Sequence, residues 1–114
     1  MIAVIFELEP SAGQAQRYFE WAEALKASLM GLDGFISIER FESMGQPGRY
    51  LSLSFWRDEA AVRQWRNTQA HRVAQRDGRS RVFASYRLRV AEVVRDYGLS
   101  DRGQAPTDSV DALG

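Results

Sequence analysis

Short runs of β-branched and aromatic residues alternate with longer segments of helical periodicity over the first 97 residues, and this order constrains the fold more than any other feature. The short runs predict strands over residues 2–8, 35–41, 49–56 and 86–94. Apolar residues at helical spacing predict one helix over 14–30 and a second that starts at Asp58. The order β-α-β-β-α-β folds readily as a four-stranded antiparallel sheet with both helices on one face, the ferredoxin-like α+β arrangement.

Polar residues mark where the two helices should begin. Ser11 and Gln14 resemble a capping box, in which two side chains satisfy free backbone donors at a helix start. Asp58 is a favourable N-cap for the second helix. Asn67 and Thr68 are expected to interrupt that helix and to cap its continuation, so the second helix should consist of two pieces.

Both faces of the predicted sheet carry apolar side chains, although two helices can cover only one face. In the first strand every second residue from Ile2 points one way, and Ala3 and Ile5 point the other way. In the third predicted strand Leu51, Leu53 and Phe55 alternate with Tyr50, Ser52, Ser54 and Trp56, so apolar groups again point to both faces. Burying a large apolar side chain contributes roughly 1.5 to 3 kcal/mol, so leaving a whole face in water is unfavourable. A second copy packed sheet to sheet would cover it, and the pattern therefore predicts a homodimer.

Charge and composition narrow the classes of partner. The chain has 15 Lys and Arg residues against 15 Asp and Glu residues, so it lacks a broad field of one sign that would attract nucleic acid. Arginines recur over residues 63–81, but acidic residues interleave with them, which favours a solvated helix face over nucleic-acid binding. Cysteine is absent, which removes disulfides and thiolate chemistry and suits a reducing compartment.

The two ends of the chain give expectations about location and order. Residues 1–6 are apolar, but they have no basic leader and stop at Glu7, short of a signal peptide or a membrane span. We therefore expect a cytoplasmic protein without membrane contact. Residues 98–114 are polar and contain few large apolar side chains, so we expect a disordered tail after a single domain over 1–97.

Residues 56–71, WRDEAAVRQWRNTQAH, resemble the central block of the antibiotic biosynthesis monooxygenase family. The block has a Trp at the end of a strand, an acidic helix start, a second Trp and a His six residues later. The resemblance covers roughly residues 1–97 and includes Gly34-Phe35 and the final strand, YRLRV. It implies a fold of the dimeric α/β barrel superfamily. The family's members include cofactor-free oxygenases of polycyclic phenols, quinol-oxidising proteins and haem-degrading enzymes.

Cofactor-free oxidation makes specific demands on side chains. A deprotonated phenol or anthrone can pass an electron to O2 and couple with it, so the protein must supply a pocket for a flat aromatic, a base and groups that hold an oxyanion. His71 is the only histidine and has the side-chain pKa nearest to neutral, so it is the predicted base. We predict a monooxygenase or quinol oxidase that acts with O2 on a phenolic or polycyclic aromatic, without a cofactor or a metal.

Six further residues are candidates for the pocket, which should lie between the sheet and its helices. The candidate walls are Trp65 and Trp56, the candidate hydrogen-bond donors are Asn67 and Tyr50, and the candidate anion-binding residues are Arg40 and Arg89. Each has a structural alternative. The tryptophans are typical core residues, Tyr50 and the two arginines could line a dimer interface, and His71 could be a histidine satisfied by backbone groups.

Two other functions compete with this hypothesis. In haem-degrading relatives, as we align them, an Asn in the first strand and a His about ten residues after the helical Trp complete the haem site. Phe6 and Gln75 occupy these positions, so an iron ligand and a distal amide are missing, and haem degradation is a minor alternative. The main alternative is a non-catalytic dimeric module for small-molecule binding or stress response, because fold alone does not distinguish it from an enzyme.

Overall fold

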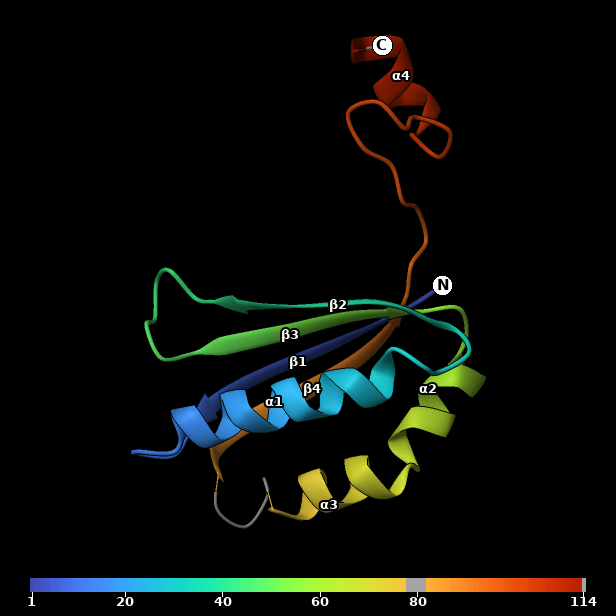
Figure 1. Cartoon of the computed structure of the whole chain (residues 1–114). Helices are drawn as coiled ribbons and strands as arrows, with labels where there is room; N and C mark the ends of the chain where they lie inside the picture. Colours follow the sequence, from blue (N-terminus) through green and yellow to red (C-terminus); the bar gives the residue numbers. More distant parts are fainter. Residues whose placement is uncertain (78–81, 114) are drawn as a thin grey trace.

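A computed structural model describes residues 1–77 and 82–113 of the chain. Four strands form one sheet in the order β2-β3-β1-β4, and every neighbouring pair is antiparallel. Helices α1, α2 and α3 all lie on one side of this sheet (Figure 1). The elements are β1 (Ile2–Pro10), α1 (Ala15–Leu29), β2 (Phe35–Glu42), β3 (Tyr50–Trp56), α2 (Glu59–Arg66), α3 (Gln69–Asp77), β4 (Phe83–Glu92) and α4 (Thr107–Leu113). The predicted ferredoxin-like α+β fold is confirmed.

Strand register decides which side chains reach the helices. Val4 in β1 lies opposite Ser54 in β3 and Val90 in β4, so these three residues share one face of the sheet. The same alternation places Ile5 and Leu53 together on the opposite face. No helix from α1 to α3 covers that opposite face, which we call the outer face (Figure 1).

Two clusters of buried side chains hold the helices on the sheet. One cluster centres on Trp56, which is 1% exposed and packs with Leu29, Val62 and Trp65. The other centres on Leu8, which is also 1% exposed and packs with Tyr18 and Val82. Full burial of side chains of this size contributes roughly 1.5 to 3 kcal/mol each, so these contacts fix α1 and α2 against the sheet. The space between the two clusters is where a cavity forms.

The structure tests the predicted helix ends. The capping box at Ser11 and Gln14 is wrong, because α1 begins one residue later and Gln14 makes no side-chain capping hydrogen bond. The N-cap at Asp58 is confirmed, since its Oδ1 accepts a hydrogen bond of 2.9 Å from the backbone N–H of Ala61. The interruption at Thr68 is also confirmed, because α2 ends at Arg66 and α3 begins at Gln69.

The last strand starts earlier than its sequence pattern indicates. The periodicity predicts a strand over 86–94, whereas β4 runs from Phe83 to Glu92 and pairs with β1 along its length. A register shift between Glu9 and Pro10 lets β1 pair as far as Phe83. This early start brings Phe83 beside Phe6, with ring centroids 5.5 Å apart, and so adds an aromatic ring to the helix side of the sheet.

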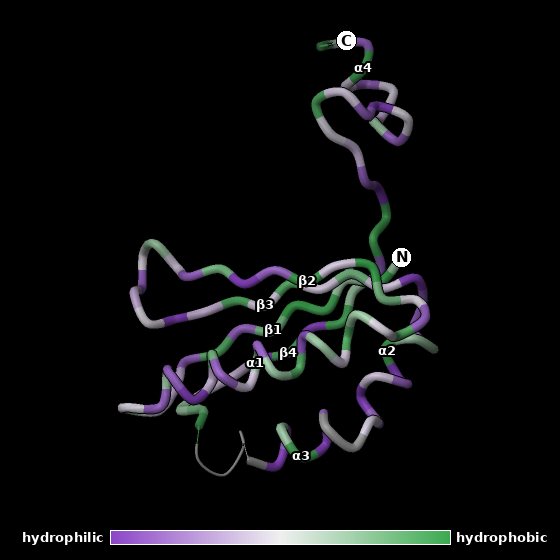
Figure 2. The backbone as a smooth tube through the Cα atoms, viewed as in Figure 1, coloured by the Kyte–Doolittle hydropathy of each residue, from purple (hydrophilic) through white to green (hydrophobic). Residues whose placement is uncertain are grey.

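Beyond β4 the chain leaves the sheet on the side away from α1, α2 and α3 and ends in α4 (Figure 1). Hydrophobic residues give way to hydrophilic ones as the chain departs (Figure 2), and Val94 is 78% exposed. None of the described residues of α4 is buried. The sequence predicts disorder over 98–114, and the structure forms this one short helix there, so the boundary of the domain at residue 97 stays a prediction. No helix in the described part of the chain is long and apolar enough to span a membrane.

Candidate active site

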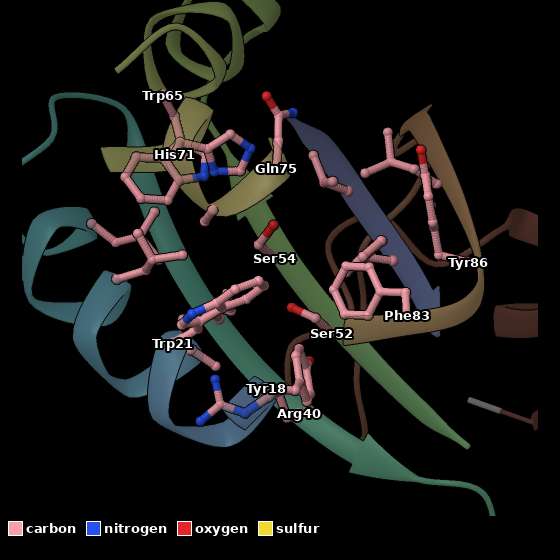
Figure 3. A pocket seen from close by; sticks show the side chains of 18 of the residues that line it. Tyr18, Trp21, Arg40, Ser52, Ser54, Trp65, His71, Gln75, Phe83 and Tyr86 are labelled. Carbon is pink, nitrogen blue, oxygen red and sulfur yellow. The ribbon is translucent and has the colours of Figure 1, made fainter. Parts of the chain in front are cut away.

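A cavity of about 700 Å³ lies between the helix side of the sheet and the helices α1 and α3. Every strand contributes to its lining, as do α1, α2 and α3. Its walls are mostly apolar and aromatic, and they include Val4, Phe6, Leu25 and Leu88. Trp21 and Phe83 also belong to these walls (Figure 3). A volume of this size is within the range of roughly 300 to 1,000 Å³ that is typical of pockets for small molecules.

The break between α2 and α3 places a histidine against this cavity. The hydroxyl of Thr68 donates a hydrogen bond of 2.9 Å to the carbonyl of Trp65 and accepts one of 3.3 Å from the backbone N–H of His71. This cap starts α3 directly after the break, and residues of α3 line the cavity. The imidazole of His71 packs on the indole of Trp65, with ring centroids 4.8 Å apart.

The surroundings of His71 keep its imidazole neutral. Burial, followed by the positive charges of Arg72 and Arg66, lowers the pKa of His71 to about 4. Its Nδ1 atom is buried and has no hydrogen-bond partner among the described residues. A buried polar atom without a partner is unfavourable, so this nitrogen is a candidate contact for a bound molecule.

A second polar group lies on the floor of the cavity. Arg40 in β2 is directly opposite Ser52 in β3, and both line the cavity. Glu23 accepts one hydrogen bond of 3.3 Å from Nη2 of Arg40. Tyr18 lies at the same end of the cavity as Arg40 (Figure 3), and burial raises its pKa to about 12 although the charge of Arg40 opposes this shift. The Tyr18 hydroxyl is therefore protonated at neutral pH.

Three of the residues predicted for the site line this cavity. His71 and Trp65 contribute from the two helical pieces, and Arg40 contributes from the sheet. Figure 3 shows His71 beside Trp65 at one side of the cavity and Arg40 at the other. Their chemical roles stay predictions.

The structure places the other four predicted residues away from the cavity lining. Trp56 is in the core, where its indole N–H donates a hydrogen bond of 2.9 Å to Ser54. Tyr50 packs edge to face on Phe19, with ring centroids 5.0 Å apart. Asn67 is the C-cap of α2, and its side chain accepts a hydrogen bond from Arg72.

Arg89 does not point inward as its predicted role requires, because strand register turns it away from the helices. It lies opposite Ile5 and therefore points to the outer face. There its Nη1 forms an ion pair of 3.2 Å with Glu7, whose other carboxylate oxygen pairs with Arg49 at 3.1 Å. Arg89 consequently cannot stabilise an anion inside this cavity.

The sequence also contains signals for lining residues that were not predicted. Ser52 and Ser54 occupy alternate positions on the helix side of β3, where an apolar residue is usual, and small polar residues there leave room for a ligand. Trp21 lies one helical turn before Leu25 and both line the cavity, which a helical projection of α1 could have indicated. Gln75 and Phe6, at the positions aligned with haem-binding residues, also line it.

Potential metal ligands do not cluster in the part of the chain that the structure describes. There, no three His, Cys, Asp or Glu side chains gather as a metal ion would require. The residues that line the cavity offer an imidazole, aromatic rings, hydroxyl groups and arginines.

Comparison with known proteins identifies the family. A family profile described as antibiotic biosynthesis monooxygenase matches residues 1–77. The chain belongs to this family. Antibiotic biosynthesis monooxygenase structures also share the fold: a Deinococcus radiodurans protein assigned to the family superposes with a TM-score of 0.77 at 16% identity, over 87% of this chain and 98% of that one. Rv0793 from Mycobacterium tuberculosis gives a TM-score of 0.76 at 15% identity, over 85% of this chain and 98% of that one.

Two relatives are similar in sequence to this antibiotic biosynthesis monooxygenase family member. A protein of Pyricularia oryzae named jasmonate monooxygenase ABM is 46% identical over 93 residues, which are 82% of this chain and 43% of that protein. The chain thus spans less than half the length of that relative. The uncharacterized protein YqjZ of Bacillus subtilis is 33% identical over 93 residues, which are 82% of this chain and 79% of that protein.

Proposed function

We propose that the protein is a cofactor-independent monooxygenase that uses O2 to oxidise an activated methylene group of a small phenolic or polycyclic aromatic compound. The observation that carries this proposal is the position of His71, whose neutral imidazole faces an aromatic cavity with a buried nitrogen that lacks a partner in the described structure. Membership of the antibiotic biosynthesis monooxygenase family and a relative that is named a monooxygenase support it.

The reaction balances without an external reductant. His71 takes one proton from the activated methylene group, and the resulting carbanion passes an electron to O2 and couples with it to form a peroxide. The imidazolium returns the proton to the peroxide, and loss of water from the hydroperoxide leaves a carbonyl group. Overall, one methylene group and one O2 molecule give one carbonyl group and one water molecule, so the carbon loses four electrons and O2 gains four.

The low pKa of His71 makes it a weak base, and the charges around it compensate in part. Arg72 and Arg66 lower this pKa because they repel the imidazolium. The same positive charges stabilise an anion of the substrate, so they lower the pKa of the group that gives up the proton. The proton transfer therefore depends on a substrate whose anion is delocalised, such as an anthrone.

Oxygen consumption tests the proposal. Uptake of O2 is measured after chelation of metals, with a panel of anthrones and hydroquinones and with jasmonate, the compound named in the Pyricularia oryzae relative. We expect uptake well above the uncatalysed rate for at least one compound, and a loss of about 10²-fold to 10⁴-fold in His71→Ala, the usual contribution of a general base. Retained uptake in His71→Ala would assign the base to another residue.

A binding module without catalysis is the second candidate function. The observation that favours it is again the pKa of about 4 at His71, since a general base works best with a pKa near the operating pH. In that case compounds of the panel would bind in the cavity and quench the fluorescence of Trp21 and Trp65, but none would be consumed. Binding without O2 uptake would thus replace the oxygenase by the binding module.

A further inference from the structure

The charged side chains that the structure describes in the cavity lining are arginines. Arg40, Arg72 and Arg76 contribute to the lining, whereas no Asp or Glu does so among the residues whose side chains the structure describes. The remaining walls are mainly apolar. A cavity with apolar walls and arginines suits a molecule that has an apolar body and a negative charge.

The three arginines differ in how far water screens them. Arg72 and Arg76 lie on α3 and are exposed, and Arg72 already donates to the side-chain oxygens of Asn67 and Gln75. Arg40 lies on the sheet, and its side chain is only 27% exposed. Charges near apolar walls are screened less than charges in water, so Arg40 is the arginine that would attract an anion most strongly.

Arg40 keeps most of its hydrogen-bonding capacity for a ligand. A guanidinium has five N–H donors, and the described structure uses one nitrogen, Nη2, for Glu23 at 3.3 Å. The Glu23 side chain is 69% exposed, and water weakens an ion pair that is as exposed as this one. A carboxylate on the cavity side can therefore bind Arg40 without first breaking a strong interaction.

Two hydroxyl groups lie near Arg40 and can add donors. Ser52 is the cross-strand partner of Arg40 and lines the cavity beside it. Tyr18 lines the same end, and it keeps its proton at neutral pH. An arginine flanked by two hydroxyl donors matches the flat, two-oxygen geometry of a carboxylate.

We propose that the cavity binds an apolar ring compound that carries a carboxylate, with the carboxylate on Arg40 and the opposite end of the ring system at His71. Figure 3 shows these two residues at opposite sides of the cavity, with Ser52 and Ser54 between them. The carboxylate end is thus held away from His71. The position of the ring end at His71 rests on the proposed function, because His71 is the proposed base and oxidation would take place at that end.

Matched ligands and matched variants test the proposal. Calorimetry under anaerobic conditions compares 2-naphthoate with 2-naphthamide, which has nearly the same shape and no charge. We expect the wild-type protein to bind 2-naphthoate about tenfold more tightly, as a charge-assisted bidentate hydrogen bond implies. Arg40→Met should abolish this preference and Arg40→Lys should keep part of it, since a lysine retains the charge but not the planar geometry.

Arg89→Met is the control, because it removes an equal charge from the outer face and should leave the preference unchanged. Equal affinity of the wild-type protein for the two ligands would overturn the proposal. So would a preference that survives in Arg40→Met and is lost in Arg72→Met or Arg76→Met. The measurement needs no turnover, so a preference that depends on Arg40 in a protein without O2 uptake would support this site and contradict only the proposed oxidation.

Discussion

At the scale of single residues, the environment of His71 links protein stability to pH. The folded protein protonates His71 only near pH 4, whereas the unfolded chain does so near its ordinary pKa of 6.5. The unfolded state therefore binds more protons between these values, and stability falls as the pH decreases from about 6.5 to 4. The loss is at most about 3 kcal/mol, and less because the imidazole is partly exposed to solvent.

Chemical denaturation at pH 7 and at pH 4.5 measures this dependence. His71→Gln has no titrating group, so its stability should decrease less than that of the wild-type protein over the same interval. Carboxylates titrate equally in both proteins, and the comparison removes their contribution. Equal decreases in the two proteins would show that His71 is not held neutral by the fold.

Gly34 is required for both its backbone conformation and its lack of a side chain. Its φ is +88°, and an added Cβ would lie 2.6 Å from Cβ of Ala61. Gly13 has a similar φ of +77° but no atom within 4 Å of an added Cβ. We expect Gly34→Ala to lower the free energy of unfolding by about 2 to 4 kcal/mol and Gly13→Ala by about 1 to 2 kcal/mol. Thermal unfolding of both variants checks this, and equal losses would mean that the contact with α2 relaxes freely.

The sequence predicted which types of residue form the site better than it predicted the face of the sheet to which each side chain points. His71 stood out because it is the only histidine, and Trp65 because it is the second Trp of the block that resembles the family. From the sequence, Arg40 and Arg89 were equally good candidates for binding an anion. Only strand pairing places Arg40 on the helix side of the sheet and Arg89 on the outer face. A shift of one residue in register would exchange these positions, so sequence periodicity alone could not separate them.

At the scale of secondary-structure elements, the start of α3 depends on one hydroxyl group. Thr68 bridges the carbonyl of Trp65 and the backbone N–H of His71. Thr68→Val keeps the shape of the side chain and removes both hydrogen bonds, at a cost of about 1 kcal/mol. Amide hydrogen exchange should become faster at His71 and Arg72, the first residues that this cap orders. Thr68→Ser retains the hydroxyl and should keep the slow exchange, whereas unchanged exchange in Thr68→Val would contradict the role of the cap.

The order of the elements was predictable because periodicity differs between strands and helices, but several of their ends were not. The start of α2 after Asp58 has a local cause, because the Asp58 side chain accepts a hydrogen bond from the backbone N–H of Ala61, three residues later. The start of β4 at Phe83 depends on pairing with Pro10, more than 70 residues away in sequence, so no local pattern contains it. The beginning of α1 was misread for a related reason, because Ser11 instead donates its backbone N–H to the carbonyl of Val82 at 2.6 Å.

The cavity itself has no local signal in the sequence. The helices enclose a certain volume over the sheet, and the cavity is the part of that volume that side chains do not fill. Ser52 and Ser54 leave space where larger residues could fill it, and α3 spans the gap from beyond the break at Thr68. Such a difference depends on tertiary packing, which a pattern of apolar and polar residues does not encode.

At the scale of the whole molecule, the outer face of the sheet is expected to join two copies of the chain. Ile5, Leu51, Leu53 and Phe55 point to this face, and α1, α2 and α3 lie on the other side (Figure 1). A charge in the centre of such an interface would lose its hydration on association. We therefore expect Leu53→Asp to convert a dimer into a monomer of 12.9 kDa, as measured by light scattering after size-exclusion chromatography.

A charge on the helical side serves as the control for this dimer prediction. Ala27 is exposed on α1, so Ala27→Asp should leave the mass of the assembly unchanged. A wild-type protein that elutes as a monomer would contradict the sheet-to-sheet dimer. A dimer that persists in Leu53→Asp would place the interface on another surface.

The strand order has a consequence for synthesis of the chain. Of the four strands, β1 leaves the ribosome before the other three, yet it lies inside the sheet between β3 and β4. Its edge toward β4 stays unpaired until residues 83–92 have also emerged, and an unpaired apolar strand edge is a site where other chains can attach. The lining of the cavity includes residues of β4 as well, so a nascent chain cannot complete the cavity before β4 joins the sheet.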